Sequence, residues 1–398
     1  MTIQNLYLTD TIDEALVDKI HAEIVTIDGH IDVRDGFNSP GNDAGQDTEG
    51  QFDLPKLLRG KLKVSVVALA ADAVPDTAEG HTRARQQIEA KYNALAKLVA
   101  DHPQHLAFAR SSADIKDIIS TGKQAILLSF LNAVSLGTDL SALKIFHERG
   151  VRLLGLVHIG NNAFAHSSRP NKAFGDKPDN NLGLTDLGKE AVTELNRLGI
   201  IVDVTQLSPR GLEETISLSK TPVIASHSAV RGRVDSPRNL SNSELKAIAE
   251  SGGVVNIVAF APYLRDRDGS QEAFNTEVFA PFNLRQGLDD PRAVLSAEDF
   301  ERFQAGYRKF SGKRHQFASL VDYLDAVDYA VRLIGIDHVG LSSDFNNGGG
   351  VIGYAHVGEA KNVTRELVRR GYDQTAIEKL WGGNFLRVLK QAEAFSAS

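Results

Sequence analysis

The stretch 185–206, TDLGKEAVTELNRLGIIVDVTQ, contains the pattern that decides the fold. Residues 185–198 have the periodicity of an amphipathic helix, and Thr185 is suited to be its N-cap. Gly199 follows, and glycine readily adopts the left-handed conformation in which many helices end. Residues 200–204 are then mostly apolar, as in a strand that helices cover on both faces. The stretch therefore predicts a helix, a tight turn and a buried parallel strand.

The same unit recurs along the chain. Helical patterns lie at 82–100, 140–149, 185–198 and 242–251, and candidate strands at 23–27, 64–69, 106–109, 125–130, 153–158, 200–204, 222–226, 254–258 and 338–341. Such repeats form either a closed barrel or an open doubly wound sheet. No G-x-G-x-x-G follows the first strand, so the dinucleotide-binding form of the open sheet loses its main support. We therefore predict an α/β protein with a (β/α)8 TIM-like barrel, in which the short strand 106–109 lies outside.

Length and composition predict a single domain over residues 1–398. The chain has 398 residues, of which 42% are hydrophobic and 24% charged, and no linker divides it. Residues 261–317 lack a clear period and are expected to be an insertion on one barrel face, either a lid or an oligomer contact.

Charge and residue usage exclude several partners and sites. The net charge of −7 argues against nucleic acid and against an anionic membrane surface, which both favour a basic face. The absence of cysteine excludes disulfides and thiolate metal sites. We see no signal peptide and no stretch of about 20 apolar residues, so we expect a cytoplasmic protein without a membrane partner.

Polar and ionisable residues stand at the predicted ends of six strands, which converge on one site in a barrel. They are His30, Asp32, Asn132, His158, Thr205, Gln206, His227, Ser228 and Asp344. Imidazole and carboxylate together suit a divalent metal such as zinc. His30 and Asp32 are two residues apart on a strand, so their side chains share a face and can bind one ion.

These motifs together resemble the renal (membrane) dipeptidase family, within the amidohydrolase-type metal-dependent barrels. The resemblance covers nearly the whole chain and rests on IDGHID, DLSALKIFHERGVRLLGLVHIGNN, GLTDLGKEAVTELNRLGIIVDVTQLS, TPVIASHSAVRGRVDSPRNLSNSELKAIAESGGVV, GIDHVGLSSDF and GGNFLRVL. It implies a TIM barrel and hydrolysis of a dipeptide or a related small amide. Activity in the family depends on two zinc ions with a bridging hydroxide, and the family tends toward homodimers.

The resemblance also implies a role for each matching residue. His30 and Asp32 would bind one metal, and His227 would help to bind the other. Asp344 would be the proton shuttle, and His158 would donate a hydrogen bond to the substrate carbonyl. Arg231 would pair with the C-terminal carboxylate of the substrate, and Asn162 is placed with it among the substrate-binding residues.

Two family positions are altered here. Leu131 stands where the family has a glutamate that bridges both metals, and Gln206 replaces a histidine ligand. Losing the bridge removes negative charge between two dications about 3.5 Å apart. We therefore expect one zinc ion rather than two, with a metal-free site as the remaining possibility. Two alternatives to a dipeptidase-like hydrolase stay open: a metal-independent enzyme with a different reaction, and an inactive binding homologue.

Overall fold

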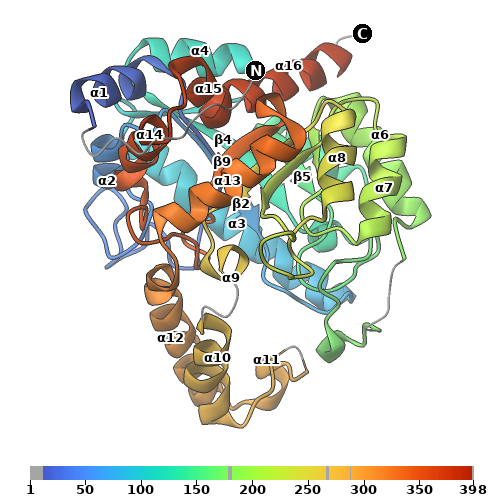
Figure 1. The fold of residues 1–398 in the computed structure, drawn as a ribbon. Coiled ribbons are helices and arrows are strands. Elements are labelled where there is room, and N and C mark those ends of the chain that lie inside the picture. The colour runs from blue at the N-terminus through green and yellow to red at the C-terminus, as the bar shows by residue number, and fades with distance from the viewer. Residues whose placement is uncertain (1–11, 178–181, 266–268, 287, 397–398) are drawn as a thin grey trace.

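The computed structural model describes residues 12–177, 182–265, 269–286 and 288–396, and Figure 1 shows their arrangement. At the centre of this described part, eight parallel strands follow one another in the order β1-β2-β4-β5-β6-β7-β8-β9. Ile31 in β1 pairs in parallel with Phe345, which follows β9, and the backbone nitrogen of Asp32 donates to the Phe345 carbonyl at 3.0 Å. The last strand thus returns to the first, as predicted for a (β/α)8 TIM-like barrel.

The barrel strands are short and buried along their whole length, as the sequence predicts. They are β1 (Ile27–Asp32), β2 (Val64–Ala70), β4 (Gln124–Leu131), β5 (Val151–Gly155), β6 (Ile201–Asp203), β7 (Ile224–Ser228), β8 (Val254–Val258) and β9 (Val339–Ser342). The ninth strand, β3 (Leu106–Ala109), pairs only with the first half of β4, and β5 pairs with β4 from Leu128 onward. Its predicted position outside the barrel is confirmed.

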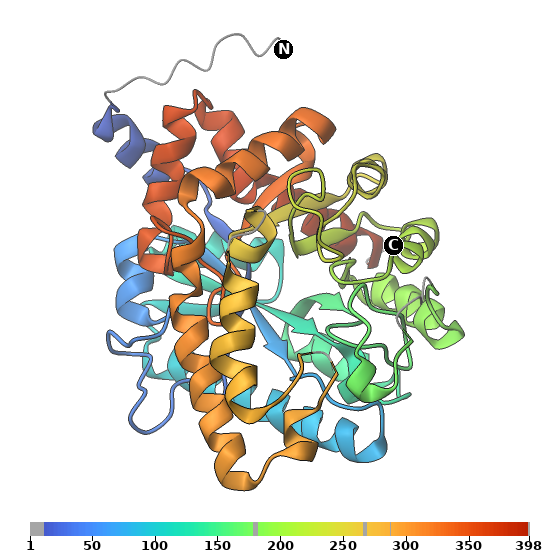
Figure 2. The ribbon, with the colours of Figure 1, turned by 60° about the horizontal axis from the view of Figure 1, so that its bottom comes forward.

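Helices surround the barrel (Figures 1 and 2). They are α1 (Glu14–Glu23), α2 (Leu54–Gly60), α3 (Ala78–Asp101), α4 (Ser112–Ser120), α5 (Ala142–Arg149), α6 (Asp186–Leu198), α7 (Pro209–Leu218), α8 (Asn242–Glu250), α13 (Leu320–Ile334), α14 (Ala360–Arg369), α15 (Gln374–Glu378) and α16 (Asn384–Ser396). In α6 the Thr185 hydroxyl accepts from the Gly188 backbone nitrogen at 3.0 Å, and Gly199 has φ 69°. The predicted N-cap and glycine C-cap are therefore both present.

An apolar layer closes the end of the barrel at which the strands begin. The first residues of the strands pack there against one face of α16, and the members of this layer include Ile27, Val64, Ala125, Leu153, Ile201, Ile224, Val254, Phe385, Val388, Leu389 and Ala392. Because this end is apolar, the buried polar side chains of the strands collect toward the opposite end, where a barrel of this class places its site.

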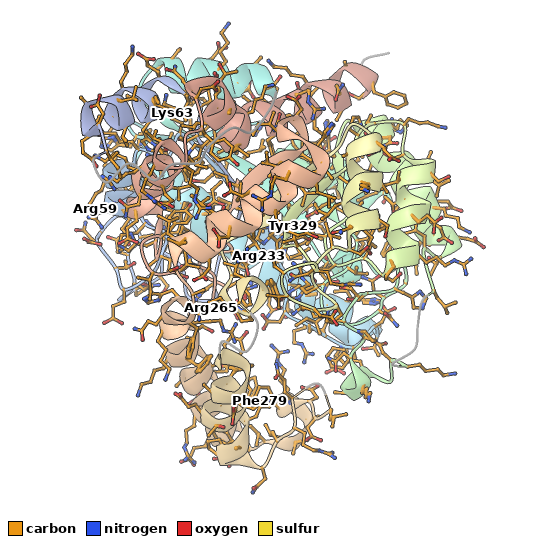
Figure 3. All side chains as sticks on the ribbon, viewed as in Figure 1. Arg59, Lys63, Arg233, Arg265, Phe279 and Tyr329 are labelled. Atoms are coloured by element: carbon orange, nitrogen blue, oxygen red, sulfur yellow. The ribbon has the colours of Figure 1, made fainter. Side chains whose placement is uncertain are left out.

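The expected insertion at 261–317 is a helical lobe that projects from the barrel (Figures 1 and 2). It contains α9 (Ala261–Leu264), α10 (Ser270–Phe274), α11 (Pro291–Val294) and α12 (Ala297–Lys313). The lobe has an apolar cluster of its own, which includes Phe279, labelled in Figure 3, and Phe303. The sequence shows no clear period here, yet α12 is a helix of 17 residues. Its apolar side chains pack within the lobe instead of on the barrel.

Some predicted element limits are wrong. The apolar pattern predicts the first strand at 23–27, but Glu23 is the last residue of α1 and β1 runs from Ile27 to Asp32. The sequence Asp28–Gly29–His30 interrupts the apolar run and still belongs to the strand. Gly29 is required there because a Cβ on it would collide with the Asn256 side chain of β8. His30 and Asp32 thus lie inside the strand instead of beyond it.

Candidate functional site

Three strands of the barrel bring the predicted metal ligands together. His30 and Asp32 lie on β1, His227 lies on β7, and Asp344 follows β9 by two residues. The rings of His30 and His227 are stacked with centroids 3.8 Å apart. Ligand atoms of His30, His227 and Asp344 all lie within 4.8 Å of one another. His30 Nε2 is 3.3 Å from Asp32 Oδ2 and 3.9 Å from Asp344 Oδ1. The structure therefore brings all four side chains to one point.

Several possible ligand atoms of this cluster, those of His30, Asp32 and Asp344, are buried and lack hydrogen-bond partners among the described residues. Within the described part of the chain, no hydrogen bond reaches either ring nitrogen of His30, Oδ2 of Asp32 or Oδ1 of Asp344. Buried polar atoms normally have a partner, because an unsatisfied one costs free energy. Imidazole nitrogens and carboxylate oxygens are also the ligands that zinc prefers when no thiolate is available. The residues present therefore fit a divalent cation.

The electrostatics of the cluster point the same way. Burial, with a further contribution from the Asp32 carboxylate, raises the pKa of Asp344 to about 8. Burial disfavours protonation of His30, but Asp32 and Asp344 outweigh it and raise the pKa of that imidazole. Burial and then the charge of His30 hold the pKa of His227 well below its usual value. A cation in the cluster would favour the ionised carboxylates and the neutral imidazoles that metal binding requires.

The backbone at three strand ends is in the left-handed region. Asn132 has φ 76°, Gln206 has φ 71° and Asp344 has φ 57°. Such values are uncommon outside glycine and concentrate at functional sites. The backbone nitrogen of Asp344 donates to the His30 carbonyl at 3.0 Å, which fixes this turn against β1.

Leu131 occupies the interior of the barrel beside the site. It is the last residue of β4 and is 2% exposed. A Cβ built on Gly155 in β5 would lie 2.9 Å from Leu131 Cδ1 and 3.6 Å from Asp203 Oδ2. The leucine side chain thus fills the space over Gly155, next to a carboxylate. A leucine side chain offers no ligand atom, so Leu131 cannot bind a metal ion.

The Gln206 side chain forms hydrogen bonds with residues of the site. Its side-chain amide nitrogen is 3.2 Å from His227 Nε2. With the amide turned to satisfy its surroundings, the nitrogen donates to the His158 carbonyl at 3.0 Å, and the oxygen accepts from Arg238 Nη2 at 3.3 Å and from His227 Nε2. The glutamine therefore ties His227 to the β5 loop.

A buried hydrogen-bond chain holds the other side of His227. The Ser226 hydroxyl donates to Asp203 Oδ2 at 2.5 Å and lies 2.7 Å from His227 Nδ1. Asp203 Oδ1 accepts from the backbone nitrogens of Thr205 and Ser226. In the tautomer with the ring proton on Nδ1, that atom donates to the Ser226 oxygen, and Nε2 is an acceptor for the unturned Gln206 amide nitrogen or for a cation. In the tautomer with the proton on Nε2, that atom donates to the turned Gln206 oxygen instead. Our sequence analysis missed Asp203 and Ser226, although an aspartate inside an otherwise apolar strand is a usable signal.

His158 and Asn162 differ in what they can offer a substrate. His158 lies three residues beyond β5, and its Nδ1 is buried without a partner in the described chain. Burial, followed by the charge of Arg169, lowers the pKa of His158 to about 3, so this imidazole is neutral at pH 7. The Asn162 side chain instead donates to Asn132 and to the Leu156 carbonyl and accepts two backbone nitrogens. The contacts of Asn162 thus hold its own loop together.

Arg231 and Arg238 lie on the same segment after β7 but in different surroundings. Arg231 Nε donates to the Ser236 carbonyl at 3.2 Å, and no hydrogen bond or ion pair of the described residues joins it to the cluster. Arg238 is 3% exposed, and its Nη2 donates to the His227 carbonyl at 2.8 Å. The structure therefore brings Arg238 to the site, a residue that our sequence analysis did not select.

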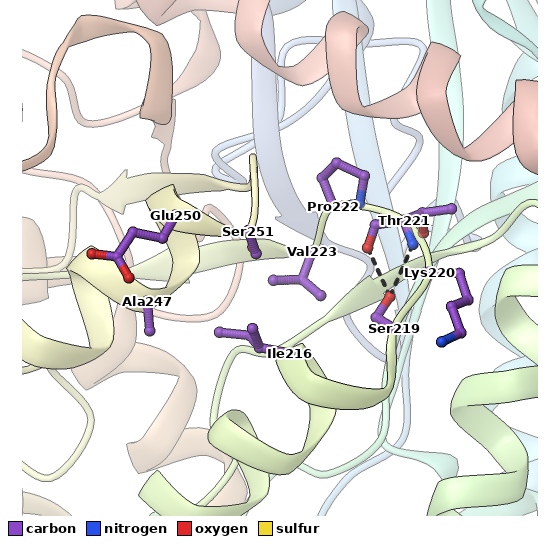
Figure 4. A pocket seen from close by; sticks show the side chains of 9 residues that line it. All are labelled: Ile216, Ser219, Lys220, Thr221, Pro222, Val223, Ala247, Glu250 and Ser251. Carbon is purple, nitrogen blue, oxygen red and sulfur yellow. Dashed lines mark hydrogen bonds between the residues drawn. The ribbon is translucent and has the colours of Figure 1, made fainter.

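A surface hollow at the other end of the barrel is separate from this cluster (Figure 4). It has a volume of about 410 Å³ and is lined by Ile216, Ser219, Lys220, Thr221, Pro222, Val223, Ala247, Glu250 and Ser251. These residues precede β7 and β8 or lie on the flanking helices. The hollow thus lies where these two strands begin, and none of the predicted site residues lines it.

Comparisons with known proteins show the family and the fold of the chain. A family model described as membrane dipeptidase, peptidase family M19, matches residues 14–398. The crystal structure of the probable dipeptidase PvdM from Pseudomonas aeruginosa is 40% identical, covers 95% of this chain and 98% of that one, and superposes with a TM-score of 0.84. Dipeptidase tcpJ of Claviceps purpurea is 26% identical over 358 residues, which are 89% of this chain and 72% of the relative.

A more distant structure shares the fold. A metallopeptidase from Rhodobacter sphaeroides, solved with a phosphinate mimic of the dipeptide L-Ala-D-Ala, is 24% identical with a TM-score of 0.72, and the match covers 93% of this chain and 99% of that one. In the part of the chain that the structure describes, no helix is long and apolar enough to cross a membrane.

Proposed function

The chain belongs to the membrane dipeptidase family of metal-dependent hydrolases, and from this premise we propose that it hydrolyses a dipeptide or a similar small amide with an atypical centre of one metal ion. The observation that carries the proposal is the cluster of His30, His227 and Asp344, whose ligand atoms lie within 4.8 Å of one another. The neighbouring position of Leu131 supports one ion instead of two, because a hydrocarbon side chain supplies no bridging charge.

The ion would be held by His30, Asp32 and His227, and we propose zinc because of this donor set. Such an ion supplies Lewis acidity toward the carbonyl of the bound amide. The Asp203–Ser226 pair orients His227 through its Nδ1. This orientation leaves His227 Nε2 directed at the cluster.

Asp344 and His158 would act on the reacting amide. The unpartnered Oδ1 of Asp344 is placed to hold a proton and to pass it to the leaving amine. His158 is neutral at pH 7, so an N–H of its ring can donate to the carbonyl oxygen as negative charge develops there. Both groups are buried, and burial strengthens these interactions relative to water.

Two arginines are candidates for the C-terminal carboxylate of the substrate. The sequence comparison favours Arg231, and we keep this as a prediction. The position of Arg238 against the His227 carbonyl supports Arg238 for the same task. Arg231→Met and Arg238→Met separate the two, because loss of the carboxylate contact raises KM for a dipeptide but has less effect on a substrate whose C-terminus is amidated.

A metal-independent reaction is the second candidate, and one observation favours it. The Gln206 amide already bonds to His227 Nε2 at 3.2 Å, the atom that a metal would need. In this alternative His227 would be a base that Ser226 and Asp203 orient, as in other oriented histidines.

Elemental analysis combined with dipeptide turnover tests the proposal. The protein is purified without chelator, its zinc content is measured, and hydrolysis of L-Ala-L-Ala and L-Ala-D-Ala is followed before and after chelation. We expect about one ion per chain and activity that chelation removes and zinc restores. Two ions per chain would contradict the single-ion centre. Activity that survives complete metal removal would favour the metal-independent alternative.

A further inference from the structure

Arg238 is a buried cation without a carboxylate partner. Its Nη2 donates to the His227 carbonyl and, with the Gln206 amide turned, to the Gln206 oxygen at 3.3 Å. Its Nη1 donates to the Ser228 hydroxyl at 3.3 Å, while its Nε has no partner in the described chain. Its guanidinium lies 5.4 Å from the centre of the Tyr263 ring. No ion pair within 4.0 Å involves it among the described residues, so its charge and its Nε lack a partner there.

Arg169 is a second cation that contacts Tyr263. It belongs to the loop after β5, and its Nη1 donates to the Tyr263 hydroxyl at 3.4 Å. Its Nε is buried without a partner in the described chain, and no ion pair there involves it either. The loop is fixed, because the Gly160 backbone nitrogen donates to the Arg169 carbonyl at 2.9 Å and the Ser168 nitrogen to the Gln206 carbonyl at 2.8 Å.

The charge of Arg169 acts on the site. After burial it is the largest cause of the lowered pKa of His158, and it also contributes to the lowered pKa values of His227 and Arg238. Two unpaired guanidinium groups thus lie around one phenol ring beside the reacting residues. Two like charges repel one another strongly where few water molecules reach them. An anion bound between or near them offsets this repulsion.

Arg370 shows how the same chain treats a structural arginine. It is buried like Arg238, but it forms ion pairs with Asp325 at 2.9 Å, Asp328 at 2.5 Å and Glu366 at 2.9 Å. The charge of Arg370 is thus compensated by three carboxylates within the fold. Arg169 and Arg238 lack such partners, and this difference marks them as groups for binding a ligand.

We propose that Arg169 and Arg238, which both contact Tyr263, select a substrate with two carboxylates, such as a dipeptide whose C-terminal residue is Asp or Glu. The inference rests on the proposed hydrolase function and adds a substrate class to it. Arg238 takes one carboxylate and Arg169 takes the second, because a guanidinium binds a carboxylate through two parallel hydrogen bonds. A substrate with an uncharged side chain leaves the guanidinium of Arg169 without a counter-ion.

The test compares L-Ala-L-Glu with L-Ala-L-Gln, which differ only in the second carboxylate. We expect kcat/KM for L-Ala-L-Glu to be at least about tenfold higher, mainly through KM, since a charged pair that is lost costs at least that much. Arg169→Met should reduce the preference to within about twofold, and Arg169→Lys should keep part of it. Arg233→Met is the matched control, because Arg233 is exposed on the same segment as Arg238 (Figure 3) and pairs with Asp325 at 3.3 Å.

Binding measured by calorimetry on the same protein separates this inference from the proposed function. If neither dipeptide is hydrolysed, the hydrolase proposal fails, but tighter binding of L-Ala-L-Glu that Arg169→Met abolishes still supports the anion site. Equal affinity of the wild type for the two dipeptides would overturn the inference, and so would a preference that Arg169→Met leaves intact. If Arg169→Met does not fold, the wild-type comparison and Arg169→Lys decide. A preference for L-Ala-L-Glu that is the same in Arg169→Lys as in the wild type, and that raised salt does not weaken, would overturn the inference, because it would not be electrostatic.

Discussion

The two sides of the candidate site are built alike but differ in chemistry. On one side, β1 and the turn after β9 present His30, Asp32 and Asp344, with unpartnered donor atoms in the described chain. On the other side, β4 and the turn after β6 present Leu131 and Gln206, a hydrocarbon and an amide. Strands of one parallel barrel place both sets at the same end.

The two sides share a positive φ at one turn residue each but carry side chains of different chemistry. Gln206 and Asp344 both have positive φ, so the two turns keep a similar unusual backbone. If ligands are absent from the β4 and β6 side, as we propose, the difference lies in the side chains at Leu131 and Gln206 and not in the barrel strands that carry them.

Asp344→Asn removes an ionisable group from the side of the site formed by β1 and the turn after β9, and we expect the largest effect from it. The amide cannot hold the proton that we assign to Oδ1, so we expect kcat/KM on the best dipeptide to fall by about 10²- to 10⁴-fold. Stopped or continuous amine-release assays on the zinc-loaded protein measure this. Asp337→Asn is the control, since Asp337 is exposed and pairs only with Lys379 among the described residues. A loss of less than threefold would remove Asp344 from the mechanism.

The double variant Leu131→Glu with Gln206→His should make the altered side like the intact one. It adds a bridging carboxylate and an imidazole, so we expect bound zinc to rise from about one to about two ions per chain. Elemental analysis after dialysis measures the ratio, with each single variant and Leu131→Gln as controls. A ratio that stays at one would indicate that the backbone on this side no longer places a ligand correctly.

Asp203→Asn tests the support behind His227. Removing a carboxylate that orients a ligating histidine through Ser226 should weaken zinc binding by about 10- to 100-fold. Competition with a chromophoric chelator measures the affinity. Asp186→Asn serves as the control, because the Asp186 side chain is 95% exposed at the start of α6. Unchanged zinc affinity would show that His227 is not a ligand or that Asp203 does not orient it.

The pH dependence of the melting temperature tests the Asp344 side of the site, and here we expect the smallest effect. In metal-free protein the pKa of Asp344 is about 8, above its unfolded value. Between pH 4 and 8 the folded state therefore holds a proton that the unfolded state has lost, and stability falls as pH rises. Asp344→Asn removes this loss, so its melting temperature should exceed that of the wild type by a few °C at pH 8 and by less at pH 5. Parallel curves from pH 5 to 8 would contradict the raised pKa.

The sequence was sufficient for the barrel because its signals are local. Helix, glycine and apolar strand recur, and the short strand 106–109 was correctly placed outside. The limits of β1 were wrong because Asp28 and Gly29 interrupt the apolar run, and only the packing against Asn256 explains why they belong to a strand.

For the site, the sequence identified the residues that lie at strand ends but not those that support them. Asp203 and Ser226 bond to His227 across two strands, and Arg169 and Arg238 meet at Tyr263 from three separate segments. Such contacts depend on where loops fold back, which no spacing in the sequence specifies. Asn162 is the opposite case. The sequence predicts that it binds substrate, but its side chain forms hydrogen bonds within its own loop.

The packing of α16 beneath the strands has a consequence for synthesis of the chain. Residues 384–396 include the side chains that seal the base of the barrel against water. Because α16 follows all of the strands in the sequence, it is translated last. The apolar residues at the base of the barrel are therefore exposed to water until α16 has been made. Chaperone dependence and sensitivity to C-terminal deletions should therefore exceed what the distance of α16 from the chemistry suggests.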